Sequence, residues 1–141
     1  MQIIIDGVKP MGAVRMTRKG KWTDKAAQRY LEYKEYLKWT ILKGISTAQK
    51  KFEPGEALHV DILFKMPIPE SNSKKLKRDL PGTPHMKTPD IDNLVKGVFD
   101  SINGILWADD NQVASVAASK VYSTEPGIEI FIKRLEGKKV G

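Results

Sequence analysis

The chain has 141 residues, with 24 lysines and arginines against 17 aspartates and glutamates, which gives a net charge of +7. Hydrophobic residues make up 40% and cysteine is absent, so a packed core is expected, while disulfides, thiolate zinc sites and cysteine nucleophiles are excluded. The positive excess favours a polyanionic partner such as nucleic acid, although a merely soluble basic protein would carry the same charge.

The first half of the chain predicts a strand, a helix and a second strand. Gln2–Ile5 is a short apolar run bounded by turn residues, which is typical of a strand. From about Asp24 to Lys43, apolar residues recur at steps of three and four, which predicts a helix whose cap is Thr23 or Asp24. The face that this helix is expected to bury consists of Ala26, Tyr30, Tyr33, Leu37 and Ile41. Over Ala57–Lys65, apolar and polar residues alternate, which predicts a strand with one buried face.

The second half begins with a long segment that has no clear period. Pro67–Pro89 contains five prolines and a basic run, and we expect it to be a mobile loop. Ile91–Asn103 then has the period of a helix, and Val113–Tyr122 and Ile128–Lys133 read as strands. The polar tail, Glu136–Gly141, is expected to fray.

The predicted order of elements is β-α-β-α-β-β. This order favours one α+β domain over residues 1–141, with a small mixed β-sheet packed with two main helices. No apolar run is long enough to span a bilayer, and the N-terminus lacks the pattern of a secretory signal. We therefore expect a cytoplasmic protein without a membrane segment.

Acidic residues gather at the start of the helix predicted over residues 91–103. Asp90 and Asp92 form an Asp-x-Asp arrangement, and Asp92, Lys96 and Asp100 make one row at four-residue spacing. Taken alone, this pattern is more typical of a helix with Asp92 as its cap and with surface ion pairs. The competing hypothesis is a hard-cation site, since Mg²⁺ prefers oxygen ligands and keeps several waters.

A second acidic pair, Asp109-Asp110, follows the helix and strengthens the metal hypothesis. If the chain folds back so that the two groups meet, three or four carboxylates converge, which is costly without a cation. Lys96 would then lie beside the ion, where it could meet a phosphate. The spacings of an EF-hand, a zinc-hydrolase helix and a phosphate-binding glycine loop are missing, which disfavours these sites and a nucleotide cofactor.

The run over residues 89–113, PDIDNLVKGVFDSINGILWADDNQV, resembles the signature of the RusA family of Holliday junction resolvases. The family pattern is Asp-x-Asp-Asn-Leu-x-Lys, an apolar stretch with Asp, then Asn-Gly, then Asp-Asp-x-Gln-Val, and the chain matches nearly every fixed position. Weaker similarity extends to residues 7–23 and 69–90. Pro89 stands where some members carry a basic residue, and Lys87 is the candidate to supply that DNA contact instead.

The resemblance implies an endodeoxyribonuclease that needs Mg²⁺, for which Mn²⁺ substitutes. It implies a homodimer that nicks two opposed strands of a four-way junction in DNA recombination and repair, as in bacteria and their prophages. By position, it makes Asp90, Asp92 and Asp110 the metal ligands, Asp109 an adjacent assisting acid and Lys96 the functional lysine.

Two basic runs are predicted to hold the phosphates of branched DNA, although any one of these residues could be only a solvated surface charge. With Lys87, they comprise Arg15, Arg18, Lys19, Lys21, Lys74, Lys75 and Lys77. Three other functions fit the sequence: a DNA-binding protein without catalysis, a nuclease for flaps, forks or duplex, and a protein whose metal only stabilises the fold. Candidates for a dimer interface, with a core role at least as expected for each, are Trp39, Ile105, Leu106 and Trp107.

Overall fold

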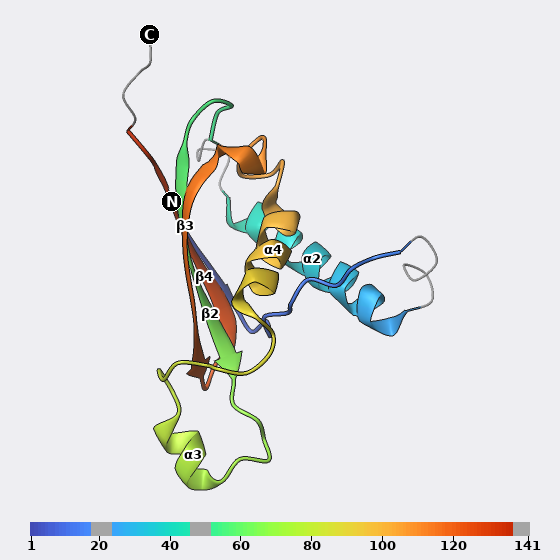
Figure 1. Cartoon of the computed structure of the whole chain (residues 1–141), viewed down its shortest axis with the longest axis vertical. Helices are drawn as coiled ribbons and strands as arrows, with labels where there is room; N and C mark the ends of the chain where they lie inside the picture. Colours follow the sequence, from blue (N-terminus) through green and yellow to red (C-terminus); the bar gives the residue numbers. More distant parts are fainter. Residues whose placement is uncertain (18–23, 46–51, 137–141) are drawn as a thin grey trace.

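The computed structural model describes residues 1–17, 24–45 and 52–136 of the chain. It is an α+β fold in which two long helices lie on one face of a four-stranded sheet, as predicted (Figure 1). Its elements are β1 (Gln2–Asp6), α2 (Lys25–Gly44), β2 (Leu58–Pro67), α3 (Lys74–Asp79), α4 (Ile91–Ile102), one 3-10 turn (Asp110–Gln112), β3 (Val113–Ser123) and β4 (Gly127–Arg134). Within these ranges, no helix has the length and apolar character needed to cross a membrane.

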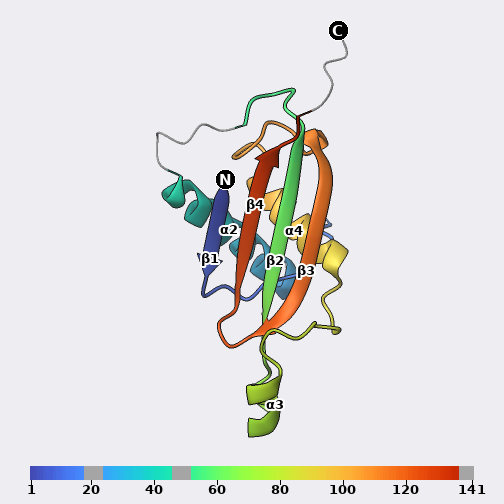
Figure 2. The ribbon, with the colours of Figure 1, turned by 90° about the vertical axis from the view of Figure 1, so that its left-hand side faces the viewer.

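The sheet is mixed, and its strands stand in the order β1-β4-β2-β3 (Figure 2). β4 pairs antiparallel with β1 and with β2, while β2 and β3 run parallel. A parallel pair needs a crossover connection, which residues 68–112 supply with α4 on the inner face of the sheet. The chain then turns at residues 124–126, so β2 stands between the two strands that follow it in sequence.

The core lies between the inner face of the sheet and the helices α2 and α4. The alternation seen in the sequence of β2 is confirmed, because its inward-facing residues are at most 2% exposed. From the two central strands the core receives Leu58, Val60, Ile62, Phe64, Ile128, Ile130 and Ile132. Burial of each such side chain contributes roughly 1.5–3 kcal/mol to folding.

α2 begins where the sequence predicts a cap. The carboxylate of Asp24 accepts a hydrogen bond from the backbone N–H of Ala26 at 2.9 Å. The stripe that α2 buries is the predicted one, except that Ala27 is buried rather than Ala26. It consists of Ala27, Tyr30, Tyr33, Leu37 and Ile41.

α3 was not predicted, and it interrupts the segment that was expected to be a loop. The hydroxyl of Ser73 caps it by accepting the N–H of Leu76 at 3.2 Å. In both views α3 projects beyond the end of the sheet, and none of its residues is buried (Figures 1 and 2). A helix of six residues with no buried face leaves no hydrophobic period in the sequence, which explains the omission.

Three of the four residues considered for a dimer interface belong to the core. Ile105, Leu106 and Trp107 are at most 8% exposed. Trp39 is the exception, since it is 56% exposed on α2, where its indole N–H donates to Glu35 at 3.1 Å.

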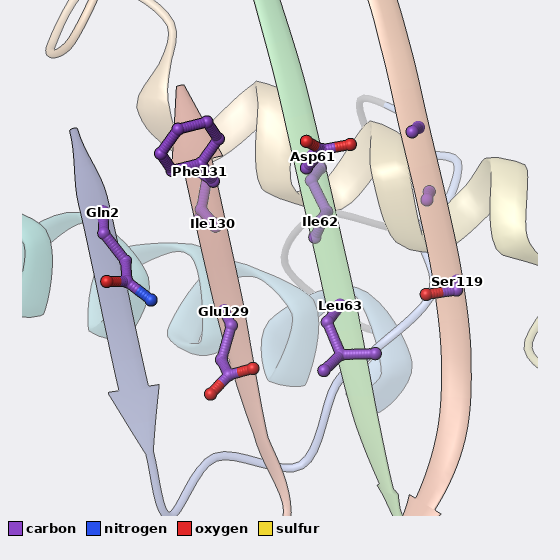
Figure 3. A pocket seen from close by; sticks show the side chains of 10 residues that line it. Gln2, Asp61, Ile62, Leu63, Ser119, Glu129, Ile130 and Phe131 are labelled. Carbon is purple, nitrogen blue, oxygen red and sulfur yellow. The ribbon is translucent and has the colours of Figure 1, made fainter. Parts of the chain in front are cut away.

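The outer face of the sheet has no described helix over it and is mixed in character. Figure 3 shows Gln2, Asp61, Leu63, Glu129 and Phe131 around a shallow depression of about 340 Å³ on this face. Two carboxylates and apolar side chains make a poor surface for a polyanion, because the carboxylates repel phosphates. A DNA-facing site is therefore expected on the helix side of the molecule.

Candidate active site

The amino end of α4 places two carboxylates at the surface. Asp90 occupies the N-cap position with an extended backbone, and its carbonyl oxygen accepts the N–H of Leu94 at 3.1 Å. The side chain of Asp90 makes no capping hydrogen bond, and Asp92 lies exposed in the first turn. The interpretation of Asp92 as the cap is therefore wrong. Both carboxylates lie at a helix end whose partial positive charge stabilises anions.

The segment of residues 11–16 crosses α4 at close range. The N–H of Ala13 donates to the carbonyl oxygen of Asn93 at 3.0 Å. A Cβ added to Gly97 would lie 3.3 Å from the carbonyl oxygen of Met11, so a side chain there would press against the crossing segment. Gly97 is consequently buried.

A depression of about 680 Å³ lies between this segment, α2 and α4. We call it the basic groove, and its charged lining residues are Arg15, Lys34, Lys96 and Asp100. The Nζ of Lys96 lies 3.3 Å from the carboxylate of Asp100, which also accepts the hydroxyl of Tyr30 at 3.1 Å. Three cations against one anion leave the groove positive, which suits DNA phosphates.

Tyr30 anchors the acid that holds Lys96. Burial and the charge of Asp100 raise the pKa of Tyr30 well above its ordinary value, so the hydroxyl stays protonated and keeps donating. The ammonium of Lys34 lies 4.8 Å from the centre of the Tyr30 ring, within the range of a cation–π contact. The predicted functional lysine is thus oriented by a chain of contacts that reaches α2.

The second acidic pair belongs to a compact turn after α4. Asp109 caps the 3-10 turn by accepting the N–H of Asn111 at 3.1 Å, and the side chain of Gln112 completes the capping box. Asp110 accepts the indole N–H of Trp107 at 2.8 Å. Both carboxylates therefore have hydrogen-bond partners within the turn. The capping role of Asp109 accounts for the position of its carboxylate without a metal ion.

α4 separates the two acidic groups. Its twelve residues span about 18 Å, and both views place its start and the turn at residues 110–112 at opposite ends (Figures 1 and 2). In the part of the chain that the structure describes, no three histidine, aspartate or glutamate residues are grouped so as to hold a metal ion. The fold-back considered from the sequence is thus not found within one chain, while the ligand roles of Asp90, Asp92 and Asp110 stay predictions.

The predicted DNA-binding residues that the structure describes fall into three places. Arg15 lines the basic groove with Lys96, and Lys87 lies in the loop before Asp90. The exposed residues of α3, which projects away from α4 in Figure 1, are Lys74, Lys75 and Lys77. Outside the described residues lie Arg18, Lys19 and Lys21.

Sequence reasoning missed Lys34 and Lys120. The ammonium of Lys120 donates to the carbonyl oxygens of Lys87 and Pro89, the latter at 2.7 Å, and so fixes the loop that leads into Asp90. Lys120 pairs with the buried Phe64 of β2, so it stands at an inward-facing position. A charged residue at an inward position of an alternating strand was the available signal.

Comparison with known proteins covers nearly the whole chain. The sequence model of the family described as endodeoxyribonuclease RusA matches residues 8–133. The chain is also similar to the uncharacterized protein YqaN of Bacillus subtilis (strain 168), with 32% identity over 130 residues, which is 90% of this chain and 87% of that protein. The family match includes the crossing segment, α4, the 3-10 turn and Lys120.

Proposed function

Because this chain belongs to the RusA family of endodeoxyribonucleases, we propose that it is a Mg²⁺-dependent enzyme that resolves four-way DNA junctions by paired symmetric nicks. Mn²⁺ is expected to replace Mg²⁺, since both ions accept oxygen ligands. The observation that carries the proposal is the position of Asp90 and Asp92, two surface carboxylates at one helix end beside a positive groove.

The donor set at the start of α4 fits such an ion. Mg²⁺ is commonly held by one or two carboxylates together with waters and substrate phosphates. Asp90 and Asp92 would provide the carboxylates, and the DNA backbone lying in the basic groove would provide the phosphate. When bound, Mg²⁺ supplies charge that polarises the phosphate and acidifies a water.

The cationic side chains of the basic groove would contact the scissile phosphate and position the DNA backbone. Lys96 is 64% exposed and pairs with Asp100, so its ammonium is able to approach a non-bridging oxygen of the scissile phosphate. Such a contact stabilises negative charge that develops during cleavage. Arg15 and Lys34 would position the backbone. The expected ends are a 5′-phosphate and a 3′-hydroxyl.

Asp110 would act in the active site of a second copy of the chain. It lies beyond the far end of α4 from Asp90 and Asp92, and no group of three acids forms among the residues described for one chain. Two copies related by a two-fold axis, with their α4 helices antiparallel, would set Asp110 of one beside Asp92 of the other. A homodimer of this kind has two symmetric sites, which suits a junction with two-fold symmetry.

Asp92→Asn is the direct test of the site. It should abolish Mg²⁺-dependent cleavage of a synthetic four-way junction while leaving junction binding in EDTA within about twofold of wild type, since the charge removed faces the ion rather than DNA. Asp61→Asn is the matched control, because Asp61 lies on the outer face of the sheet (Figure 3). Full cleavage by Asp92→Asn would remove the acid from the site.

A mixing experiment tests whether two copies complete each site. Asp92→Asn and Asp110→Asn should each be inactive on a supercoiled plasmid that carries a cruciform. After subunit exchange, a mixed dimer would hold one intact site and one doubly mutated site, so the mixture should nick the plasmid without linearising it. If each site were built within one chain, every site in the mixed dimer would carry a mutation and no nicking would appear.

The same protein and DNA substrates distinguish the proposed activity from the three alternatives. A DNA-binding protein without catalysis would bind the junction but leave it intact at every divalent-ion concentration. A nuclease for flaps or forks would cleave those substrates faster than the four-way junction. A metal that only stabilises the fold would raise the melting temperature with Mg²⁺ and cause no nicking.

A further inference from the structure

A second depression, of about 690 Å³, adjoins the start of α4 on the other side of the crossing segment. We call it the loop cavity, because its walls come from residues 9–12, 66–70, 85 and 87–89 with Tyr122 of β3. Nothing in the proposed cleavage reaction uses it. Its volume is within the usual range for small-molecule sites, about 300–1,000 Å³.

The walls of the loop cavity are apolar and end in an aromatic pair. Met66, Pro67 and Ile68 line one side, where β2 ends. The rings of His85 and Tyr122 also line it, and they meet with centroids 4.8 Å apart and planes tilted by 59°. Aromatic side chains of this kind offer a surface on which a planar ring can stack.

His85 is the polar group built into this wall. It is 9% exposed, and its Nδ1 is fully buried without a hydrogen-bond partner among the residues that the structure describes. Burial, followed by the charges of Lys120 and Lys87, lowers the pKa of His85, so the ring is neutral at neutral pH. A proton on Nδ1 would leave a buried donor without a partner, which costs more than an unused acceptor. The tautomer with its proton on Nε2 is therefore favoured, and Nε2 would be the donor offered to a ligand.

The rim of the cavity is positive and shares a segment with the candidate metal ligands. Lys9 and Lys87 lie at the rim, and Glu70 is the one acid among the described residues that line the cavity. The loop from Lys87 to Pro89 forms one wall and runs directly into Asp90, and Lys120 fixes it through two carbonyl oxygens. A ligand seated in the cavity would therefore lie next to Asp90.

We propose that the loop cavity receives a nucleobase of the DNA, from a nucleotide that flanks the scissile phosphate. The base stacks against the wall formed by His85 and Tyr122, and Lys9 and Lys87 hold the adjoining phosphates. This proposal rests on the proposed function, because it needs a DNA strand at Asp90.

The chemistry of the cavity favours a nucleotide over other ligands. An apolar wall with aromatic rings suits the base, while the two rim lysines suit the phosphate next to it. Extrusion of a base from duplex DNA costs a few kcal/mol and costs least where pairing and stacking are already interrupted, as at a branch point. A neutral His85 donor would give the cavity a preference among bases.

The proposal is tested by binding in EDTA, without cleavage. Four-way junctions are made with a single abasic site at each position near the nick, and the affinity of the wild-type protein is measured for each. One position should show a loss of roughly 5- to 100-fold, the equivalent of base–aromatic stacking. In Tyr122→Leu the same abasic site should cost no more than about twofold, because the intact base has lost its platform.

A matched variant and a second readout keep the test decisive. Tyr36→Leu removes an aromatic ring that is 48% exposed on α2, and it should retain the wild-type abasic penalty. His85→Gln keeps a hydrogen-bond donor in the wall of the cavity. In a library of junctions with random sequence beside the nick, this variant should prefer a different base there than the wild-type protein does. If no position shows an abasic penalty, or if Tyr122→Leu keeps it in full, the loop cavity holds no base.

The outcomes separate this proposal from the proposed function. A protein that never nicks junctions but shows the position-specific penalty would support the base cavity and refute the nuclease assignment. A protein that cleaves with Mg²⁺ but shows no such penalty would do the opposite.

Discussion

Replacing Lys120 with methionine tests whether one half-buried ammonium holds the loop that presents Asp90. Lys120 donates to the carbonyl oxygens of Lys87 and Pro89 and is only partly accessible to solvent. Methionine has a similar length and keeps the apolar stem, so the substitution removes the charge and the donors with little change in volume. The two carbonyl oxygens would lose their partner, and the loop its link to β3.

The expected cost follows from those two bonds. A hydrogen bond from a charged donor is worth about 1.5–3 kcal/mol, and water reaches part of this site, so the lower end applies. After allowance for the gain from the more apolar side chain, we expect a loss of about 2 kcal/mol in the free energy of unfolding. In a chain of this size that loss lowers the melting temperature by roughly 5–8 °C.

Urea unfolding followed by circular dichroism measures this loss, with Lys133→Met as the control. Lys133 is exposed on β4, on the outer face of the sheet, so the same substitution there should change stability by less than about 0.5 kcal/mol. Lys120→Met should also slow Mg²⁺-dependent cleavage, because Asp90 follows the loosened loop. A loss below about 0.5 kcal/mol in Lys120→Met would refute the argument that this lysine fixes the loop.

Three further substitutions probe other contacts. Gly127→Ala would place a Cβ 2.6 Å from the carbonyl oxygen of Ile5, so β1 and β4 would have to separate. Urea unfolding should show a loss of about 2–3 kcal/mol in the free energy of unfolding. An unchanged unfolding midpoint would contradict this expectation. Trp107→Phe removes ring volume from the core and the indole donor to Asp110, and should cost about 2–3 kcal/mol by the same assay. Burial lowers the pKa of His85 below its usual value near 6.5, so the unfolded chain takes up that proton first and stability falls as pH drops below about 6.5. Melting curves of His85→Leu should show a smaller loss, and equal losses would refute the assignment.

Most of the fold could be predicted from the sequence because the helices and strands of the core show strong hydrophobic periodicity. The alternation in β2 and the stripe from Tyr30 to Ile41 on α2 each reflect one buried face, and each was located within a few residues. α3 escaped because it buries nothing. The pairing order β1-β4-β2-β3 is set by contacts between distant segments, and no local pattern encodes it.

The residues of the candidate site could be predicted from the sequence, but their arrangement in space could not. The spacing of Asp92, Lys96 and Asp100 correctly placed them in one row, and the Lys96–Asp100 pair is observed. The length of α4 sets Asp110 far from Asp90, and no motif spacing in the sequence showed whether the chain after the helix folds back toward Asp90. Gly97 is buried by a segment more than eighty residues away in sequence, so no helical wheel could show it.

The bare outer face of the sheet makes this protein convenient to observe at work. The chain contains no cysteine, so a single Glu129→Cys substitution would give a unique attachment point for a fluorophore. Figure 3 shows Glu129 on the face opposite the helices, away from both the basic groove and the loop cavity. Energy transfer between donor- and acceptor-labelled copies would then report the arrangement of a dimer, with and without a junction, without touching the surfaces assigned to DNA.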